Sequence, residues 1–262
     1  MSGAELQVMT LSQLTAGQDW RLTLAHDRED GLLIWITRGQ GRLLLDGQRR
    51  GIGTHNAIVV PASHLFALDL GRQGVGQAVI IPAASGLPFP QVPAQLRIRE
   101  AAAMSELTAL IEAATREQQA ARPLLNTAMG AHGTLISVWL QRQIAQEEHI
   151  PPRPNAAARL TAAYTKRISA HFHEPLTMSD HAHALQVTPT HLTRACKAAT
   201  GKTAAELLTE RILYEARNLL TTTQVPAQDI ARYLGFGSAA YFTRFMLHHT
   251  SHTPSALRKA AA

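Results

Sequence analysis

Cysteine and long apolar stretches are what this sequence has least of. Cys196 is the only cysteine in 262 residues, so neither an intramolecular disulfide nor a cysteine-rich zinc site can form. No apolar run approaches the roughly 20 residues that would cross a bilayer. The opening MSGAELQVMT lacks the basic and apolar regions of a secretion signal. We therefore expect a cytoplasmic protein with no membrane partner.

Charge is also scarce, and it is unevenly distributed. Charged residues make up only 17%, whereas hydrophobic residues, at 45%, supply ample apolar surface for packed cores, and the length fits two domains. Residues 1–155 contain 13 Arg and 13 acidic residues, whereas residues 156–262 contain 12 basic and 6 acidic residues, so the net charge of +6 lies entirely in the second part. This asymmetry is expected where one domain binds a polyanion, although a solvated basic face would look the same.

Short β-like runs fill the segment between Glu5 and Ile81. Turn signals separate them, and no helical stretch intervenes. Strands at this spacing predict an antiparallel sandwich or barrel, to which we assign residues 1–98. The Asp46-Gly47 pair predicts a tight hairpin, because Gly accepts the positive φ of such a turn. The runs are Glu5–Leu11, Trp20–His26, Leu32–Arg38, Arg42–Asp46, Ala57–Val60, Leu65–Leu70 and Gln77–Ile81.

Two amphipathic helices are predicted within residues 99–149, and Pro123 suits the first turn of the second. Their apolar stripes must pack against the barrel, against each other or against a second subunit, so packing within the chain and a homodimer interface both stay open. The prolines between His149 and Asn155 predict a linker at residues 150–158. The stripes are Leu107, Leu110, Ile111 and Ala114 in the first helix and Leu125, Met129, His132, Ile136, Trp139 and Gln143 in the second.

Two segments of the C-terminal part, at about residues 178–199 and 227–249, share one plan. In each, a short helix, a tight turn and a second helix follow one another, which is a helix-turn-helix motif. Thr188 and Ser238 are the predicted N-caps of the second helices, and Pro189 takes the first helical position. The segment Ala204–Leu220 between the motifs has the period of one long helix. Such a duplication arises by chance far less often than one motif does.

This arrangement has a direct physical use. A DNA major groove about 12 Å wide admits one helix, whose N-terminal residues then face the base edges. Two such helices on a rigid connector can enter successive grooves about 34 Å apart. One chain would then bind a bipartite site on double-stranded DNA.

Four short signatures stand within residues 160–258: Gly201-Lys202-Thr203, Ile230-Ala231 with Gly235-Phe236, Tyr241-Phe242-Thr243-Arg244, and Thr253-Pro254-Ser255 with Arg258. Over these residues the sequence resembles the AraC/XylS family of bacterial transcription regulators. This resemblance implies a two-domain protein: an all-β, cupin-like barrel that binds an effector and dimerises through a helical hairpin, followed by an all-α, seven-helix DNA-binding domain at residues 159–260. The sequence departs from the family pattern at Met246, Leu247 and Ser251, which affects the end of the second motif.

Positions that match the family give the candidate DNA contacts. Arg can form two hydrogen bonds to guanine, whereas Thr and Ala offer a methyl group or a weak hydrogen bond, so we expect the first recognition helix to discriminate more strongly than the second. For Thr193 and Thr243 an ordinary helix-surface role is the alternative. The base contacts are predicted to be Thr190, Thr193 and Arg194 in the first helix and Ala239, Ala240, Thr243 and Arg244 in the second. The phosphate contacts are predicted to be Thr188, Lys197, Lys202 and Ser238.

Several residues of the two motifs are better explained as core. Cys196 stands where the family has an aromatic core residue, so we predict a small buried hydrophobe rather than a redox sensor. The other predicted core residues are Leu192, Leu213, Ile230, Leu234, Phe236 and Phe242.

The histidines predict neither a metal site nor a cofactor. Histidines that are adjacent or two apart, as in His171-Phe-His173 and His248-His249, point to different faces of a helix, and no carboxylate or thiol set completes a coordination shell. The β-segment lacks the His-x-His spacing of metal-dependent cupins. We therefore expect no enzymatic activity, with a cupin enzyme as the remote alternative.

The effector site is the least defined feature. An inward-facing Arg would suit an anionic effector, although a structural or rim role is the alternative for every candidate. Two hypotheses remain: a regulator that responds to a small organic effector, and one whose barrel is only a dimerisation module. An activator would also contact RNA polymerase. The effector candidates are Trp20, Arg21, Trp35, Arg38, His55, His64 and Phe66.

Overall fold

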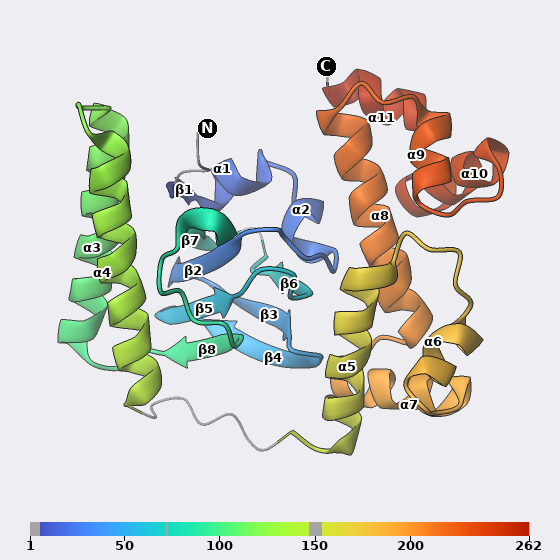
Figure 1. Ribbon diagram of the computed structural model, residues 1–262, viewed down its shortest axis with the longest axis horizontal. Helices are drawn as coiled ribbons and strands as arrows, with labels where there is room; N and C mark the ends of the chain where they lie inside the picture. Colours follow the sequence, from blue (N-terminus) through green and yellow to red (C-terminus); the bar gives the residue numbers. More distant parts are fainter. Residues whose placement is uncertain (1–5, 72, 147–153, 262) are drawn as a thin grey trace.

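The computed structural model describes residues 6–71, 73–146 and 154–261. Figure 1 shows a pair of helices, a β-rich middle part and a larger helical part arranged side by side. We call β1 to β8 the β-domain. Its elements are β1 (Gln7–Thr10), α1 (Leu11–Thr15), α2 (Trp20–Thr23), β2 (Gly31–Arg38), β3 (Gln40–Leu45), β4 (Gln48–Gly53), β5 (Asn56–Val60), β6 (Phe66–Asp69), β7 (Val75–Ile81), the 3₁₀ turn η1 (Ala83–Ser85) and β8 (Ala94–Arg97).

The strands form two antiparallel sheets. The larger has the order β1-β7-β2-β5-β8 and the smaller the order β4-β3-β6. Apolar residues of both sheets, such as Ile34, Leu43 and Phe66, belong to one buried cluster, so the sheets pack face to face. The predicted β-domain followed by an all-helical domain is confirmed.

Strand β2 is buried on both faces, which explains its unbroken apolar run from Leu32 to Ile36. Leu32 and Ile34 face the interior between the sheets, whereas Leu33 and Trp35 belong to a second cluster on the outer face of the larger sheet. Two helices, α3 (Ala101–Ala120) and α4 (Leu125–Ala145), cover that face. The predicted helix pair is confirmed, although α4 begins two residues after Pro123 rather than around it.

The smaller sheet turns its outer face to the other helical part. Leu44 and Ala67 share a buried cluster with Tyr164 and Ile168 of α5 (Ala156–His171). The predicted hairpin turn is present: Asp46 and Gly47 have φ values of 50° and 65°. A Cβ on Gly47 would come within 2.4 Å of the backbone nitrogen of Ala162, so this turn touches α5 closely.

One predicted strand is wrong, and two strands were not predicted. Residues Trp20–Thr23 form α2 instead of a strand, because Trp20 is buried against Tyr214 of the helical part, a distant contact that outweighs the local preference. Strands β4 and β8 were missed because Gly51, Gly53 and Pro93 made their sequences look like turns. Residues 150–153 of the predicted linker at residues 150–158 lie outside the described residues, and residues 156–158 already belong to the first turn of α5.

Seven helices follow within the described residues 154–261, and we call them the helical domain. They are α5, α6 (Met178–Ala184), α7 (Pro189–Thr200), α8 (Ala204–Thr222), α9 (Ala227–Tyr233), α10 (Ala239–Thr250) and α11 (Pro254–Ala261). Along the described chain, no helix is both long and apolar enough to span a bilayer.

Candidate nucleic-acid interface

The first helix-turn-helix consists of α6 and α7. Gln186 in the turn has a φ of 56°, and the Thr188 hydroxyl accepts a hydrogen bond from the His191 backbone N–H at 3.2 Å. Pro189 occupies the first turn of α7, and Gly201, with a φ of 80°, ends the helix. The predicted N-cap and helix start are therefore confirmed.

The second helix-turn-helix consists of α9 and α10 and repeats this plan. The Ser238 hydroxyl accepts a hydrogen bond from the Tyr241 backbone N–H at 3.1 Å, as expected of an N-cap. Gly235 in the turn has a φ of 76°, and a Cβ there would lie 3.1 Å from the His173 carbonyl oxygen. Phe236 packs against the rings of Phe242 and Phe245, which holds the turn onto α10.

One face of α7 is open to solvent and carries hydrogen-bonding groups. Thr190, Arg194 and Lys197 are exposed, and Thr193 is half-buried. Leu192 and Cys196 are buried on the opposite face. No carboxylate of the described residues lies within ion-pair distance of Arg194, so its guanidinium is available to an outside acceptor.

The exposed face of α10 offers fewer polar groups. Ala239 and Ala240 are exposed at its first turn and carry no hydrogen-bonding side-chain atom. The Thr243 hydroxyl already donates to the Ala239 carbonyl at 2.9 Å. Arg244 is exposed, with its guanidinium 5.9 Å from the ring centre of Tyr241. Arg244 is therefore the strongest hydrogen-bonding group on this face.

Lys202 is placed differently from the other phosphate candidates. Its ammonium group lies 2.5 and 2.7 Å from the two carboxylate oxygens of Glu210. One of these oxygens also accepts the backbone N–H of Ala25 in the β-domain, at 3.1 Å. Lys202 must leave this ion pair before it can bind a phosphate, whereas Lys197 is exposed. The roles of both lysines stay predictions.

The two motifs share one connector and one core. Helix α8 has 19 residues, which corresponds to about 28 Å at 1.5 Å per residue. Leu213 and Leu220 of α8 share a buried cluster with Ile230, Leu234 and Phe242 of the second motif and with Leu192 of the first.

Cys196 belongs to this core. Burial raises the pKa of its thiol to about 11, so the thiol stays protonated at neutral pH. The predicted small buried hydrophobe is confirmed.

A polar seam joins α8 to the β-domain. Arg211 donates from Nε to Asp27 at 2.5 Å and from Nη1 to Glu215 at 2.8 Å. The His26 ring stacks on Tyr214 with 4.0 Å between ring centres, and burial lowers the pKa of His26 to about 3. A cavity of about 600 Å³ opens along the seam, lined from both domains.

The sequence did not point to this seam. Arg211 and Asp27 are 184 residues apart, and neither belongs to a recognisable motif.

The structure does not bring the seven effector candidates into one site: Trp20 lies with Arg21 and Trp35 with His55, in two separate places. Trp20 and Arg21 face α8, where Arg21 donates to the Thr221 hydroxyl at 3.4 Å. Trp35 faces α3 and donates to the Thr108 hydroxyl at 3.3 Å, and the His55 ring stacks beside it.

The three remaining candidates are scattered. Phe66 fills the interior between the sheets, Arg38 is exposed at the end of β2, and His64 bonds to the Ala62 carbonyl. In the described part of the chain, no group of three metal-ligating side chains is arranged to hold an ion.

Two linked helix-turn-helix motifs, each with an exposed second helix, define a DNA-binding protein. Residues 181–260 match a protein family described as "Helix-turn-helix domain". The predicted AraC-type helix-turn-helix domain is confirmed over these residues, and a domain of this type implies DNA-binding transcription regulation.

No curated protein matches the chain. Solved structures with similarity include the C-terminal domain of AraT, a response regulator from Geobacillus stearothermophilus, at 27% identity, with 42% of this chain and 88% of that chain covered and a TM-score of 0.38. A transcriptional regulator from Chromobacterium violaceum has 28% identity, coverage of 38% and 88%, and a TM-score of 0.35. ToxT from Vibrio cholerae is similar over 96% of this chain and 97% of its own, at 12% identity and a TM-score of 0.45.

Proposed function

We propose that the protein is a sequence-specific transcription regulator that binds a bipartite operator, with α7 and α10 in successive major grooves. The observation that carries this proposal is the repeated motif: two capped helices, each exposed on one face, are joined by a connector of about 28 Å. That length approaches the roughly 34 Å between successive grooves on one side of a duplex.

The two recognition helices have unequal parts in this proposal. Arg194 and Thr190 on α7 give specific hydrogen bonds, with Thr193 beside them. On α10, Arg244 supplies the main bond, while Ala239, Ala240 and Thr243 can only contact methyl groups or exclude a base. Thr188, Ser238 and Lys197 are assigned to phosphates, and Lys202 joins them once it leaves Glu210.

A mobility-shift titration on a selected operator tests this assignment. We expect Arg194→Ala to weaken binding by about 1–3 kcal/mol and to relax the choice of one base pair. Arg244→Ala is expected to relax one base pair in the other half-site. Lys166→Ala is the matched control, because Lys166 is an exposed cation on α5, outside both recognition helices. Unchanged binding by Arg194→Ala would refute the base contact.

We propose that a homodimer forms through α4. One face of this helix packs inward with Met129, Ile136 and Trp139, while Leu135, in the middle of the helix, stays 52% exposed. Leu124 and Ile144 are also exposed near its two ends. An apolar side chain that a long helix leaves open to solvent suits contact with a second copy of the same helix.

The domain assignment of the proposal follows the sequence: a β-domain at 1–98, a dimerisation pair at 99–149, a linker at 150–158 and the DNA-binding domain at 159–260. The protein is assigned to the cytoplasm, at the nucleoid, without enzymatic activity. An activating role would add RNA polymerase as a partner.

Within this proposal, the β-domain binds a small organic effector. A specific observation favours the alternative of a ligand-free module: aliphatic residues such as Leu32, Ile58 and Ile80 fill the interior between the sheets. Thermal-shift screening of the full chain against metabolite classes separates the two. Stabilisation that also changes operator affinity supports an effector, and no shift across all classes supports the ligand-free module.

A further inference from the structure

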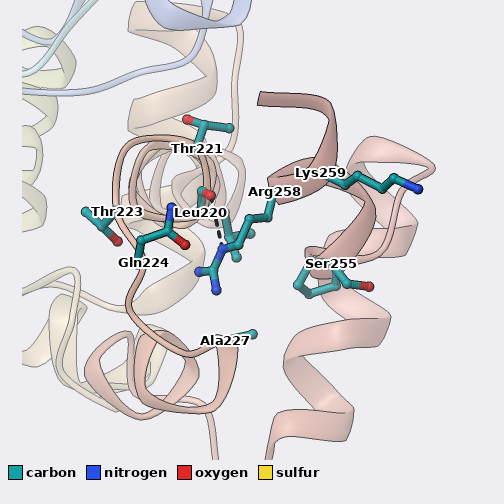
Figure 2. A pocket seen from close by; sticks show the side chains of 9 residues that line it. Leu220, Thr221, Thr223, Gln224, Ala227, Ser255, Arg258 and Lys259 are labelled. Carbon is teal, nitrogen blue, oxygen red and sulfur yellow. Dashed lines mark hydrogen bonds between the residues drawn. The ribbon is translucent and has the colours of Figure 1, made fainter. Parts of the chain in front are cut away.

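We infer that Arg258 of α11 is a positioning residue that fixes the separation of the two recognition helices, and with it the half-site spacing that one chain accepts. This inference rests on the proposed bipartite binding. It concerns a side chain that touches neither α7 nor α10 through its guanidinium, and that acts through the end of the connector α8 (Figure 2).

The last turn of α8 leaves one backbone carbonyl for Arg258. Three consecutive threonines donate their hydroxyls to the carbonyls of residues 217, 218 and 219, at 2.8, 2.7 and 2.7 Å respectively. The Thr223 N–H also donates to the Leu219 carbonyl, and the helix then ends. The Leu220 carbonyl comes next, and the Arg258 Nε donates to it at 3.5 Å.

The same guanidinium also bonds the connector between α8 and α9. The Arg258 Nη2 donates to the carbonyl of Val225, the residue before Pro226 at the start of α9. One side chain therefore joins the end of the connector helix, the segment that leads into the second motif, and the helix that follows that motif. A planar guanidinium can do this because its donors point in fixed, different directions.

Packing alone leaves room on this side of the second motif. A hollow of about 400 Å³ lies between the end of α8 and the start of α11, bordered by Leu220, Gln224, Ala227, Pro254 and Arg258. Figure 2 shows Arg258 reaching from α11 towards Leu220 across this region. The Arg258 bonds therefore span a gap that apolar side chains leave open.

The consequence concerns the second recognition helix. Both motifs pack on α8 through one shared core, and the second is attached in addition through the segment 223–226 and through the Arg258 bonds. Without those bonds, only the shared apolar core holds α9 and α10 to α8, and that core resists small rotations about the extended backbone at Thr223 less than directional hydrogen bonds do. The distance from α7 to α10 would then take a range of values.

The test uses the full chain and operators whose half-sites are moved apart or together by one and two base pairs. Wild type is expected to lose at least tenfold in affinity with each one-pair change, since this also rotates one half-site by about 34°. Arg258→Ala is expected to bind the wild-type spacing three- to tenfold more weakly and to discriminate among the spacings by less than threefold. Lys259→Ala, an exposed neighbouring cation, is expected to behave as wild type.

Two results would overturn the inference. In the first, Arg258→Ala keeps the wild-type spacing preference, either at unchanged affinity or with every spacing weakened by one common factor, which marks a general loss of stability or charge. In the second, the wild type itself shows no spacing preference, and the bipartite proposal then fails together with this inference. A wild type that keeps its preference while Arg258→Ala also keeps it contradicts this inference alone.

A second measurement needs no DNA. Spin labels at the exposed positions His191→Cys and His248→Cys report the distance between α7 and α10, because the native Cys196 is buried. A broadened distance distribution in Arg258→Ala is expected, with Arg258→Lys intermediate because it keeps the charge but has a single donor atom. Equal widths in the wild type and both variants would contradict the positioning role.

Discussion

Arg211 in the connector helix α8 forms an ion pair with Asp27 of the β-domain, and the two side chains are only 6% and 14% exposed. The Arg211 guanidinium also lies 3.7 Å from the ring centre of Phe172 and bonds Glu215. Because the Arg211 guanidinium is so enclosed, its charge is compensated by these side chains rather than by water. The pair therefore fixes how the β-domain sits on the helical domain.

Removing one side chain of the Arg211–Asp27 ion pair should destabilise the folded protein. Arg211→Ala leaves Asp27 and Glu215 partly buried without their cation, and we expect the free energy of unfolding in urea to fall by about 3 kcal/mol. Arg232→Ala removes an exposed pair with Asp229 and should change it by less than about 0.5 kcal/mol. Similar losses in the two variants would show that burial adds nothing to the Arg211 pair.

Acidification should destabilise the protein through His26. The folded pKa of His26 is lowered to about 3 from a usual 6.5, so the unfolded chain binds an additional proton between these values. Stability that is complete above pH 6.5 is therefore lost as the pH falls towards 3. This group alone should cost about 2 kcal/mol at pH 5 relative to pH 7.

Urea unfolding at both pH values measures this effect. His26→Phe keeps the ring stack and should reduce the difference between pH 7 and pH 5 by about 2 kcal/mol. The exposed His183→Phe should leave it unchanged. If His26→Phe leaves the difference in unfolding free energy between pH 7 and pH 5 unaltered, then other groups cause the acid sensitivity.

Gly47 should tolerate no side chain. Its φ of 65° already strains an L-residue, and a Cβ would lie 2.4 Å from the Ala162 nitrogen in α5. Gly71 is the matched control: its φ of 62° would also strain an added side chain, but a Cβ there would meet no atom within 4 Å. We expect Gly47→Ala to lower the unfolding free energy by at least about 2 kcal/mol and Gly71→Ala by about 1 kcal/mol. Equal losses would mean that α5 moves away at little cost.

The proposed dimer should depend on the outer face of α4. Leu135→Glu places a charge in the middle of that face and should weaken self-association at least tenfold in sedimentation equilibrium. Val92→Glu is the control, since Val92 is exposed at 72% outside α4. Both variants should keep the wild-type unfolding midpoint as monomers. A dimer that survives Leu135→Glu would place the interface elsewhere.

Features that depend on neighbouring residues were predictable from the sequence. The caps at Thr188 and Ser238 and the turn at Asp46-Gly47 are set by a few adjacent residues, and the repeat of one motif gave the helical domain its organisation. Features set by distant contacts were not. Trp20 lies in a helix because Tyr214 covers it, and no local pattern announces that contact.

The effector candidates failed to converge for a related reason. A strand's alternation tells which residues share a face but not what covers the face. Trp35 was placed as a barrel-lining candidate, yet the face it occupies is covered by α3, and Thr108 bonds its ring nitrogen. The opposite face, with Leu32 and Ile34, forms the interior.

The ion pair of Arg211 lies near the middle of α8, which extends from Ala204 to Thr222. The β-domain therefore holds the connector that both motifs share. Any shift of the β-domain would tilt the connector as one unit, so the angle at which the chain meets the duplex would change while the half-site spacing stayed the same.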